Sequence, residues 1–247
     1  MRVHSHEVNY TSPTPAAATV NDAEALTPAE KIDPIYHALL RVYGQPTWRP
    51  HHPPLDELVL TILSQHTSDL NSGRAFEQLR AALPTWEAVR DAPVSAIAAA
   101  IQSGGLAQMK APRIKAILQR IWDERGSFDL DFLKTVPLDE ARAWLAALPG
   151  VGPKTAACVL LFACGRPAMP VDTHVHRVSR RLGLVPDRAT AEQAHVLLEA
   201  MVPPEWYYAF HLNVIKHGRE VCKAPRPRCE ICVLTQWCDY YRGVRKA

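Results

Sequence analysis

The chain has 247 residues, of which 47% are hydrophobic and 21% charged, and a formal net charge of +3. These proportions are typical of a globular protein and exclude an intrinsically disordered chain. The longest apolar run, at about residues 156–164, is too short to span a bilayer, and no apolar stretch follows Arg2. We therefore expect a protein without a membrane segment or secretory signal, and a cytoplasmic location.

The N-terminal half of the chain begins with residues 1–27, which have no apolar periodicity and which we interpret as a flexible extension. Thr27 and Glu30 then form the pattern of a capping box for a helix that ends at Gly44. Apolar residues recur at helical spacing in five further segments: 55–65, 75–83, 96–101, 111–122 and 141–148.

The C-terminal half continues with residues 153–165, which are apolar on nearly every side and predict one buried helix. Three more helical segments are expected at 173–183, 189–201 and 204–222. Alternating patterns of the β type are absent and the connections are short. The sequence therefore predicts an all-α protein with ten or more helices.

Four of the six cysteines lie close together near the C-terminus with the spacing C-x6-C-x2-C-x5-C: Cys222, Cys229, Cys232 and Cys238. Thiolates bind soft metals, and four in one loop can hold either a structural zinc ion or a [4Fe–4S] cluster. Zinc sites usually contain two separated C-x2-C pairs, whereas this loop has one, which favours the iron–sulfur cluster. The other two, Cys158 and Cys164, are interpreted as small buried hydrophobic residues.

Residues 148–156, LPGVGPKTA, connect two predicted helices through the turn Gly150-Val151-Gly152. Glycines let backbone N–H groups approach a ligand closely, and the helix that follows presents unpaired N–H groups and the positive end of its dipole. Such a turn binds a phosphate group without reading bases. The alternative is that the glycines serve only the geometry of an ordinary helical hairpin.

Two ionisable residues are candidates for chemistry beside this turn. Lys154 lies in the first turn of the helix, and a nucleophilic amine must lose the proton that it holds at an ordinary pKa of about 10.4. The helix N-terminus and burial lower such a pKa, whereas a nearby carboxylate or a bound phosphate raises it, so its direction stays open. Asp172 follows eighteen residues later and is either a helix N-cap or the partner of the lysine.

Taken together, the hairpin, the lysine, the aspartate and the cysteine spacing resemble the helix-hairpin-helix DNA glycosylase superfamily, above all its endonuclease III branch. The resemblance extends from about residue 28 to the C-terminus. It implies two all-α domains with DNA bound across the cleft between them. Residues 47–166 would form a six-helix barrel, and residues 28–46 with 167–247 a domain that holds the [4Fe–4S] cluster.

The resemblance also implies a reaction on damaged double-stranded DNA by a monomeric enzyme. The lysine matched by Lys154 attacks C1′ of a flipped nucleotide and displaces an oxidised pyrimidine. The aspartate matched by Asp172 assists deprotonation and stabilises the sugar cation. A Schiff base then undergoes β-elimination, which cuts the strand at the abasic site.

Three loops would contact DNA according to the same resemblance. The loop after the first barrel helix fills the gap left by the flipped base, a second loop inserts Leu106 as a wedge, and a basic loop meets phosphates. Many relatives have Gln where this chain has His66. The residues concerned are Gln65, His66, Leu106, Gln108, Lys223, Arg226 and Arg228.

Two alternative functions remain. A monofunctional adenine or mismatch-thymine glycosylase would share the fold, but such enzymes usually have Ser or Tyr in the position of Lys154. A non-catalytic DNA-binding module would use the hairpin alone. The lysine favours the bifunctional enzyme, a DNA glycosylase with abasic-site lyase activity.

Overall fold

The computed structural model describes residues 26–246, which are helical throughout with short connections and contain no strand. The predicted flexible segment therefore lies outside the described residues up to residue 25. The first helix, α1 (Pro28–Tyr43), begins with the predicted capping box, in which the Thr27 N–H donates to Glu30 Oε2 at 2.8 Å. It ends at Gly44, as predicted, because a φ of 83° reverses the chain there.

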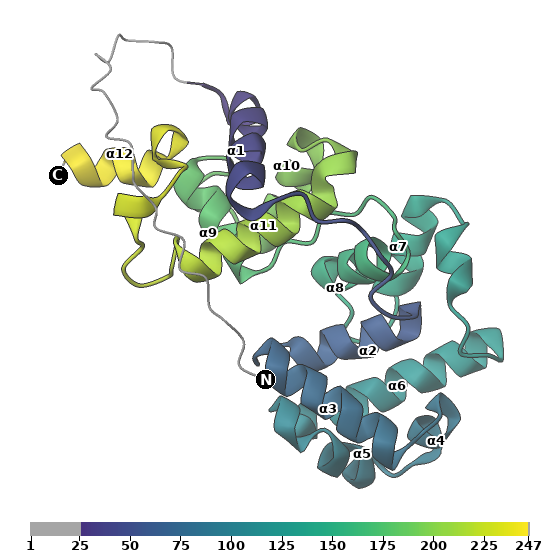
Figure 1. Cartoon of the computed structure of the whole chain (residues 1–247). Coiled ribbons are helices and arrows are strands. Elements are labelled where there is room, and N and C mark those ends of the chain that lie inside the picture. The colour runs from purple at the N-terminus through teal and green to yellow at the C-terminus, as the bar shows by residue number, and fades with distance from the viewer. Residues whose placement is uncertain (1–25, 247) are drawn as a thin grey trace, which may run out of the picture.

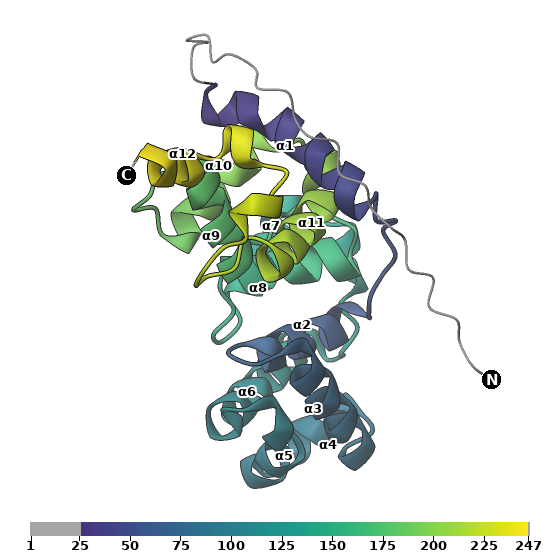
Figure 2. The same cartoon turned by 60° about the vertical axis from the view of Figure 1, so that its left-hand side comes forward.

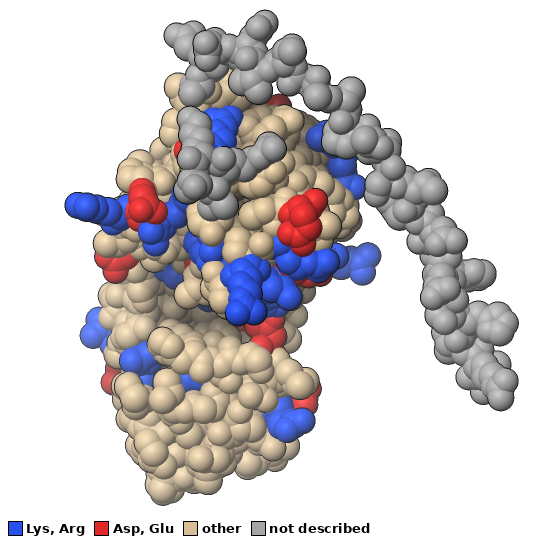
Figure 3. Space-filling view, turned by 90° about the vertical axis from the view of Figure 1, so that its left-hand side faces the viewer, with Lys and Arg blue, Asp and Glu red and all other residues tan. Residues whose placement is uncertain are grey.

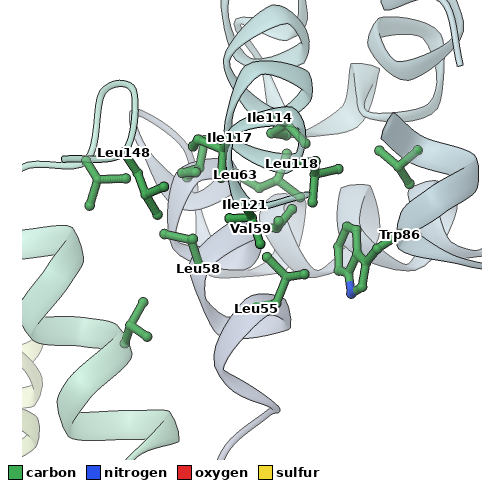
Figure 4. Packing of buried hydrophobic residues seen from close by; sticks show 14 of the residues in the cluster. Leu55, Leu58, Val59, Leu63, Trp86, Ile114, Ile117, Leu118, Ile121 and Leu148 are labelled. Carbon is green, nitrogen blue, oxygen red and sulfur yellow. The ribbon is translucent and has the colours of Figure 1, made fainter. Parts of the chain in front are cut away.

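The next helices form the lower lobe in Figures 1 and 2, followed by two more that rise toward the upper lobe. Leu58 and Val59 of α2 pack with Ile114 and Leu118 of α6 in a first hydrophobic core (Figure 4). Seven helices contribute buried residues to this core. They are α2 (Pro54–Ser64), α3 (Asp69–Ala82), α4 (Trp86–Asp91), α5 (Val94–Ala100), α6 (Ala107–Arg125), α7 (Leu138–Ala146) and α8 (Pro153–Cys158).

A second hydrophobic core lies in the upper lobe, where α1 packs along α11 although the two are far apart in sequence (Figure 2). Tyr36 stacks on Trp206 with ring centroids 4.1 Å apart. The buried Lys31 donates to Leu182 O and to Asp239 Oδ1, both at 2.8 Å, and so joins three elements of this lobe. The remaining helices are α9 (Thr173–Leu182), α10 (Ala191–Met201), α11 (Tyr207–Glu220) and α12 (Asp239–Lys246).

The segment after Gly152 is not the single helix that the sequence predicts. α8 continues as a π-helical turn over Val159–Ala163, where the Cys164 N–H donates to Val159 O at 3.2 Å. Residues of this turn face opposite cores: Val159 lies in the first core, whereas Leu161 lies in the second. The segment is apolar on all sides because it is the seam between the two lobes.

Other helix bounds differ in detail from the prediction. α3 begins at Asp69 rather than at residue 75, because the Ser68 side chain caps it by accepting from the Asn71 N–H at 3.3 Å. The six-residue α4 and the polar α12 were not predicted, since neither shows a full apolar period. Within residues 26–246, no helix combines the length and the hydropathy that crossing a membrane requires.

Candidate active site

A pocket with a volume of about 340 Å³ lies where α2 and α8 of the first core meet α11 and the start of α9. Figure 3 shows a hollow between the lobes on one side of the molecule, with Lys and Arg side chains along its upper rim. The ionisable side chains that line the pocket are His51, Glu57, Asp69, Lys154, Cys158, Asp172, His211 and Arg219. Two residues 18 positions apart in sequence, Lys154 and Asp172, thus share one pocket.

Lys154 lies in the first turn of α8, after Pro153 at the first helical position, as predicted. Burial by itself lowers the pKa of Lys154, but Cys158, Asp172 and Glu57 together outweigh burial and raise it above the ordinary value. Burial also raises the pKa of Cys158. Cys158 and the two carboxyl groups together favour the ammonium form of Lys154. Cys158 is buried, and it also interacts with the amine of Lys154.

Asp172 is the N-cap of α9, where its Oδ1 accepts the Val175 N–H at 2.7 Å. The same carboxylate also raises the pKa of Lys154. The two interpretations of this residue are therefore compatible. The cap fixes the orientation of the carboxylate, and the helix dipole favours its negative charge at that position.

His211 of α11 is a pocket residue that sequence reasoning did not identify. Its side chain is buried, and Nδ1 donates to Pro170 O at 2.8 Å, which leaves Nε2 as the unprotonated nitrogen. Burial lowers the pKa of His211 to about 4, so the ring is neutral at physiological pH. A histidine within an amphipathic helix carries no sequence signal that would have singled it out.

The hairpin turn contains one glycine with a left-handed conformation and one without. Gly150 has φ of 70°, whereas Gly152 has φ of −94° and is the N-cap of α8. Val151 between them is buried against the first core. Only Gly150 therefore adopts a backbone conformation that favours glycine.

Arg113 of α6 connects this hairpin to the loop after α2, a role that sequence reasoning missed. Its Nη1 donates to Gln65 Oε1 at 2.9 Å, and its side chain lies directly against Gly150. Gln65 and Gly150 also line a common pocket with Lys154. The structure therefore brings the first predicted DNA-contact loop next to the hairpin.

The positive φ angles of non-glycine residues coincide with the predicted DNA-contact loops. Within the described residues such angles occur at His66 (55°), Leu106 (50°) and Arg226 (54°), one in each loop. Each costs roughly 1–2 kcal/mol relative to an ordinary conformation, and such strain clusters at functional sites. Gln108, two residues beyond Leu106, is exposed.

The loop of Leu106 is exposed but firmly anchored. Leu106 is 48% exposed, which suits a wedge. Next to it, the buried Lys110 donates to Gly104 O at 2.9 Å and to Leu63 O at 2.6 Å. These bonds fix the loop to the C-terminal end of α2, beside the loop that contains His66.

The basic loop is exposed and is held by α9. Arg181 donates to the carbonyl oxygens of Lys223 at 2.7 Å and Ala224 at 2.9 Å. Arg177 donates to Cys222 O at 3.1 Å. The side chains predicted to meet phosphates are all exposed: Lys223, Arg226 and Arg228.

The four loop cysteines are free thiols: Cys222, Cys229, Cys232 and Cys238. Burial raises the pKa of Cys232 to about 11, with smaller contributions from the neighbouring thiols. Since such thiols become thiolates only beside a cation, the donor set suits a soft metal centre. No three His, Cys, Asp or Glu side chains in residues 26–246 converge as ligands around one point. Both the presence of a metal centre and its identity therefore stay predictions.

Comparison with known proteins identifies the relatives of this chain. A family model described as "HhH-GPD superfamily base excision DNA repair protein" matches residues 59–204, which include Lys154 and Asp172. Endonuclease III of Thermotoga maritima is 34% identical over 189 residues, 76% of this chain and 84% of its own length. An Arabidopsis thaliana relative, provisionally named a DNA glycosylase, is 41% identical over 165 residues. That alignment covers 67% of this chain but only 56% of the plant protein.

Solved structures show the same fold. A non-covalent complex of endonuclease III with DNA matches with a TM-score of 0.77 and 28% identity, covering 89% of this chain and 99% of that one. A thermostable thymine-DNA glycosylase matches with a TM-score of 0.72 at 24% identity, which shows the fold alone. The predicted all-α fold of the endonuclease III type is thus confirmed.

Proposed function

Because the chain belongs to the HhH-GPD superfamily of base excision DNA repair proteins, we propose that it is a bifunctional DNA glycosylase and abasic-site lyase acting on oxidised pyrimidines. The observation that carries this proposal is that Lys154 and Asp172 line one pocket at the junction of the two cores. The similarity to endonuclease III supports it. Lys154 itself weighs against the adenine and mismatch-thymine glycosylases, which usually lack this lysine.

The reaction begins with a damaged nucleotide turned out of the duplex, since its C1′ is inaccessible within the base stack. The neutral amine of Lys154 attacks C1′, the bond from C1′ to the base breaks, and the base leaves. The ionised Asp172 stabilises the positive charge that develops on the sugar. After the ring opens, the Lys154 Schiff base allows β-elimination of the 3′ phosphate.

Double-stranded DNA binds across the hollow between the lobes through contacts with the phosphate backbone of the DNA. The N–H groups of Gly150 and Gly152 and the start of α8 face a phosphate, and the exposed Leu106 enters the base stack. The basic loop adds charge contacts, which make affinity depend strongly on salt concentration. Gln65 and His66 fill the gap that the flipped base leaves.

The proposed cofactor is a [4Fe–4S] cluster on the four loop cysteines. When bound, it would hold the basic loop in one conformation and supply no redox step to the reaction. Arg177 and Arg181 fix the same loop from α9 through its carbonyl oxygens. We further propose that the enzyme acts as a monomer.

Borohydride trapping on a duplex with one abasic site tests the proposal. We expect a covalent adduct with the wild-type protein and none with Lys154→Ala. Lys216→Ala is the matched control, because Lys216 is an exposed lysine outside the pocket, and it should form the adduct normally. A panel of single-lesion duplexes then measures excision of oxidised pyrimidines against mismatched thymine and adenine. Absence of an adduct with the wild type would leave the monofunctional enzyme or the DNA-binding module.

A further inference from the structure

Glu57 is a buried carboxyl group that the proposed reaction does not use. Its side chain on α2 is only 6% exposed. One oxygen, Oε1, accepts a long hydrogen bond from Thr61 Oγ1 at 3.4 Å, whereas Oε2 is buried without any hydrogen-bond partner. Burying a carboxyl group in this state costs free energy of folding, and such groups often serve function rather than stability.

The position of Glu57 on α2 directs it into the active-site pocket. Glu57, Thr61 and Ser64 follow one another at the spacing of one helix face, and all three line the pocket. Other faces of α2 carry apolar residues such as Leu58 and Ile62, which belong to the first core. The helix thus presents a polar stripe toward α8, with which it is in contact.

Lys154 is the group on α8 to which Glu57 is electrostatically linked. The lysine lowers the pKa of Glu57, and Glu57 in turn raises the pKa of Lys154. Burial is the larger influence on the carboxyl and raises the pKa of Glu57 to about 7. The other titratable or charged groups that line the same pocket are His51, Asp69, Cys158, Asp172, His211 and Arg219.

We propose that Glu57 accepts the proton that Lys154 must lose before its amine attacks C1′. This inference rests on the proposed function, because it assigns a proton acceptor to the same nucleophile. The N–H bond of the ammonium breaks, its electron pair stays on Nζ, and an O–H bond forms at Oε2, with one water molecule relaying the proton. The pair thus changes from two opposite charges to two neutral groups.

The other candidate acceptors are less suitable. Asp172 already commits Oδ1 to the Val175 N–H, and it must stay ionised to stabilise the sugar cation. His211 is a weak base, because burial lowers its pKa to about 4. A carboxyl group that titrates near neutral pH is well matched to proton transfer at that pH. Glu57 therefore accepts the proton, whereas Asp172 stabilises the sugar cation.

The test is the pH dependence of single-turnover borohydride trapping on abasic DNA, with the full-length protein. Glu57→Gln preserves the size of the side chain but cannot accept a proton. We expect it to slow trapping at pH 7 by about 10²-fold, the lower end for general-base catalysis. The rate should recover at alkaline pH, where solvent deprotonates Lys154. Glu77→Gln is the matched control, since Glu77 is an exposed glutamate on α3 outside the pocket, and it should match the wild type.

A second variant separates proton transfer from a purely structural role. Glu57→Leu removes a buried carboxyl group in which Oε2 has no hydrogen-bond partner, so we expect an equal or higher melting temperature together with slow trapping. A structural role predicts the opposite, a lower melting temperature and a Glu57→Gln pH profile with the shape of the wild type. That result would overturn the proposal.

If the proposed function itself is wrong, the wild-type protein forms no adduct. In that case the titration of the Glu57 carboxyl carbon, followed by NMR in the wild type and in Lys154→Met, still tests the proton sharing. We expect a higher pKa of Glu57 in Lys154→Met, because the positive charge that lowers it is gone. Identical titrations in the two proteins would refute the link.

Discussion

Arg113 lies so close to Gly150 that its Nε is 2.5 Å from the position that a β-carbon at residue 150 would occupy. The same guanidinium donates to Gln65, so it connects the hairpin to the loop after α2. Gly150 also has a left-handed φ of 70°. Glycine at this position is therefore required by both the backbone conformation and a close contact, whereas Gly152 has nothing within 4 Å of its β-carbon position.

Gly150→Ala is expected to destabilise the protein by about 1–2 kcal/mol through the left-handed backbone. It should also weaken DNA binding, since Arg113 must move away from Gln65. Denaturant unfolding and fluorescence anisotropy with a duplex measure the two effects. Gly152→Ala is the matched control and should leave stability nearly unchanged. Equal losses of stability at both positions would contradict this account of the turn.

Leu106 is expected to act as a wedge while in a strained conformation. Leu106→Ala and Leu106→Gly both remove the wedge, so excision of a lesion should fall about tenfold or more while binding to undamaged DNA changes little. The glycine variant should nevertheless melt at a higher temperature than the alanine variant, because glycine adopts a φ of 50° without strain. Normal excision by either variant would exclude the wedge role.

Asp172→Asn tests the carboxylate while it preserves the helix cap, since Asn is also a good N-cap residue. We expect base release in single-turnover experiments to slow by about 10²-fold or more. The dissociation constant for lesion-containing DNA should change far less. An unchanged excision rate would mean that Asp172 serves only to cap α9.

The cysteine loop is expected to contain iron and acid-labile sulfide in equal amounts in the purified protein. Metal analysis and the visible absorption spectrum provide the measurement. Cys229→Ser should lose the iron and weaken DNA binding, because the basic loop then lacks its support. A colourless protein that contains only zinc and retains full activity would contradict the assignment of the cluster.

Acid should destabilise the protein partly through His211. Its folded-state pKa of about 4 lies below the ordinary value of 6.5, so the unfolded chain binds more protons between these limits. The stability is therefore complete above pH 6.5 and is lost as the pH falls toward 4, by up to about 1.4 kcal/mol per pH unit. Glu57 has the opposite shift and partly offsets this loss. Unfolding of His211→Gln between pH 4 and 7 should show a shallower decline than that of the wild type, and parallel curves would argue against it.

Local features of this protein follow from the sequence because their causes lie within a few residues. The capping box of Thr27 and Glu30 and the end of α1 at Gly44 depend on contacts inside one turn. The same holds for the start of α8 and for the spacing of the four cysteines. The combination of such motifs was specific enough to predict the all-α fold and to select Lys154 and Asp172, which line one pocket in the structure.

Contacts between distant segments could not be predicted in this way, because a local residue pattern does not show which distant segment packs against it. Glu57 lies almost a hundred positions before Lys154, and nothing in α2 distinguishes it from a surface glutamate. Arg113 beside Gly150, the buried His211 and the π turn at Val159 likewise depend on how the two cores meet. Folding places these groups in one poorly solvated pocket. Burial there shifts the pKa values of Glu57 and His211, whereas the neighbouring groups outweigh burial and raise the pKa of Lys154.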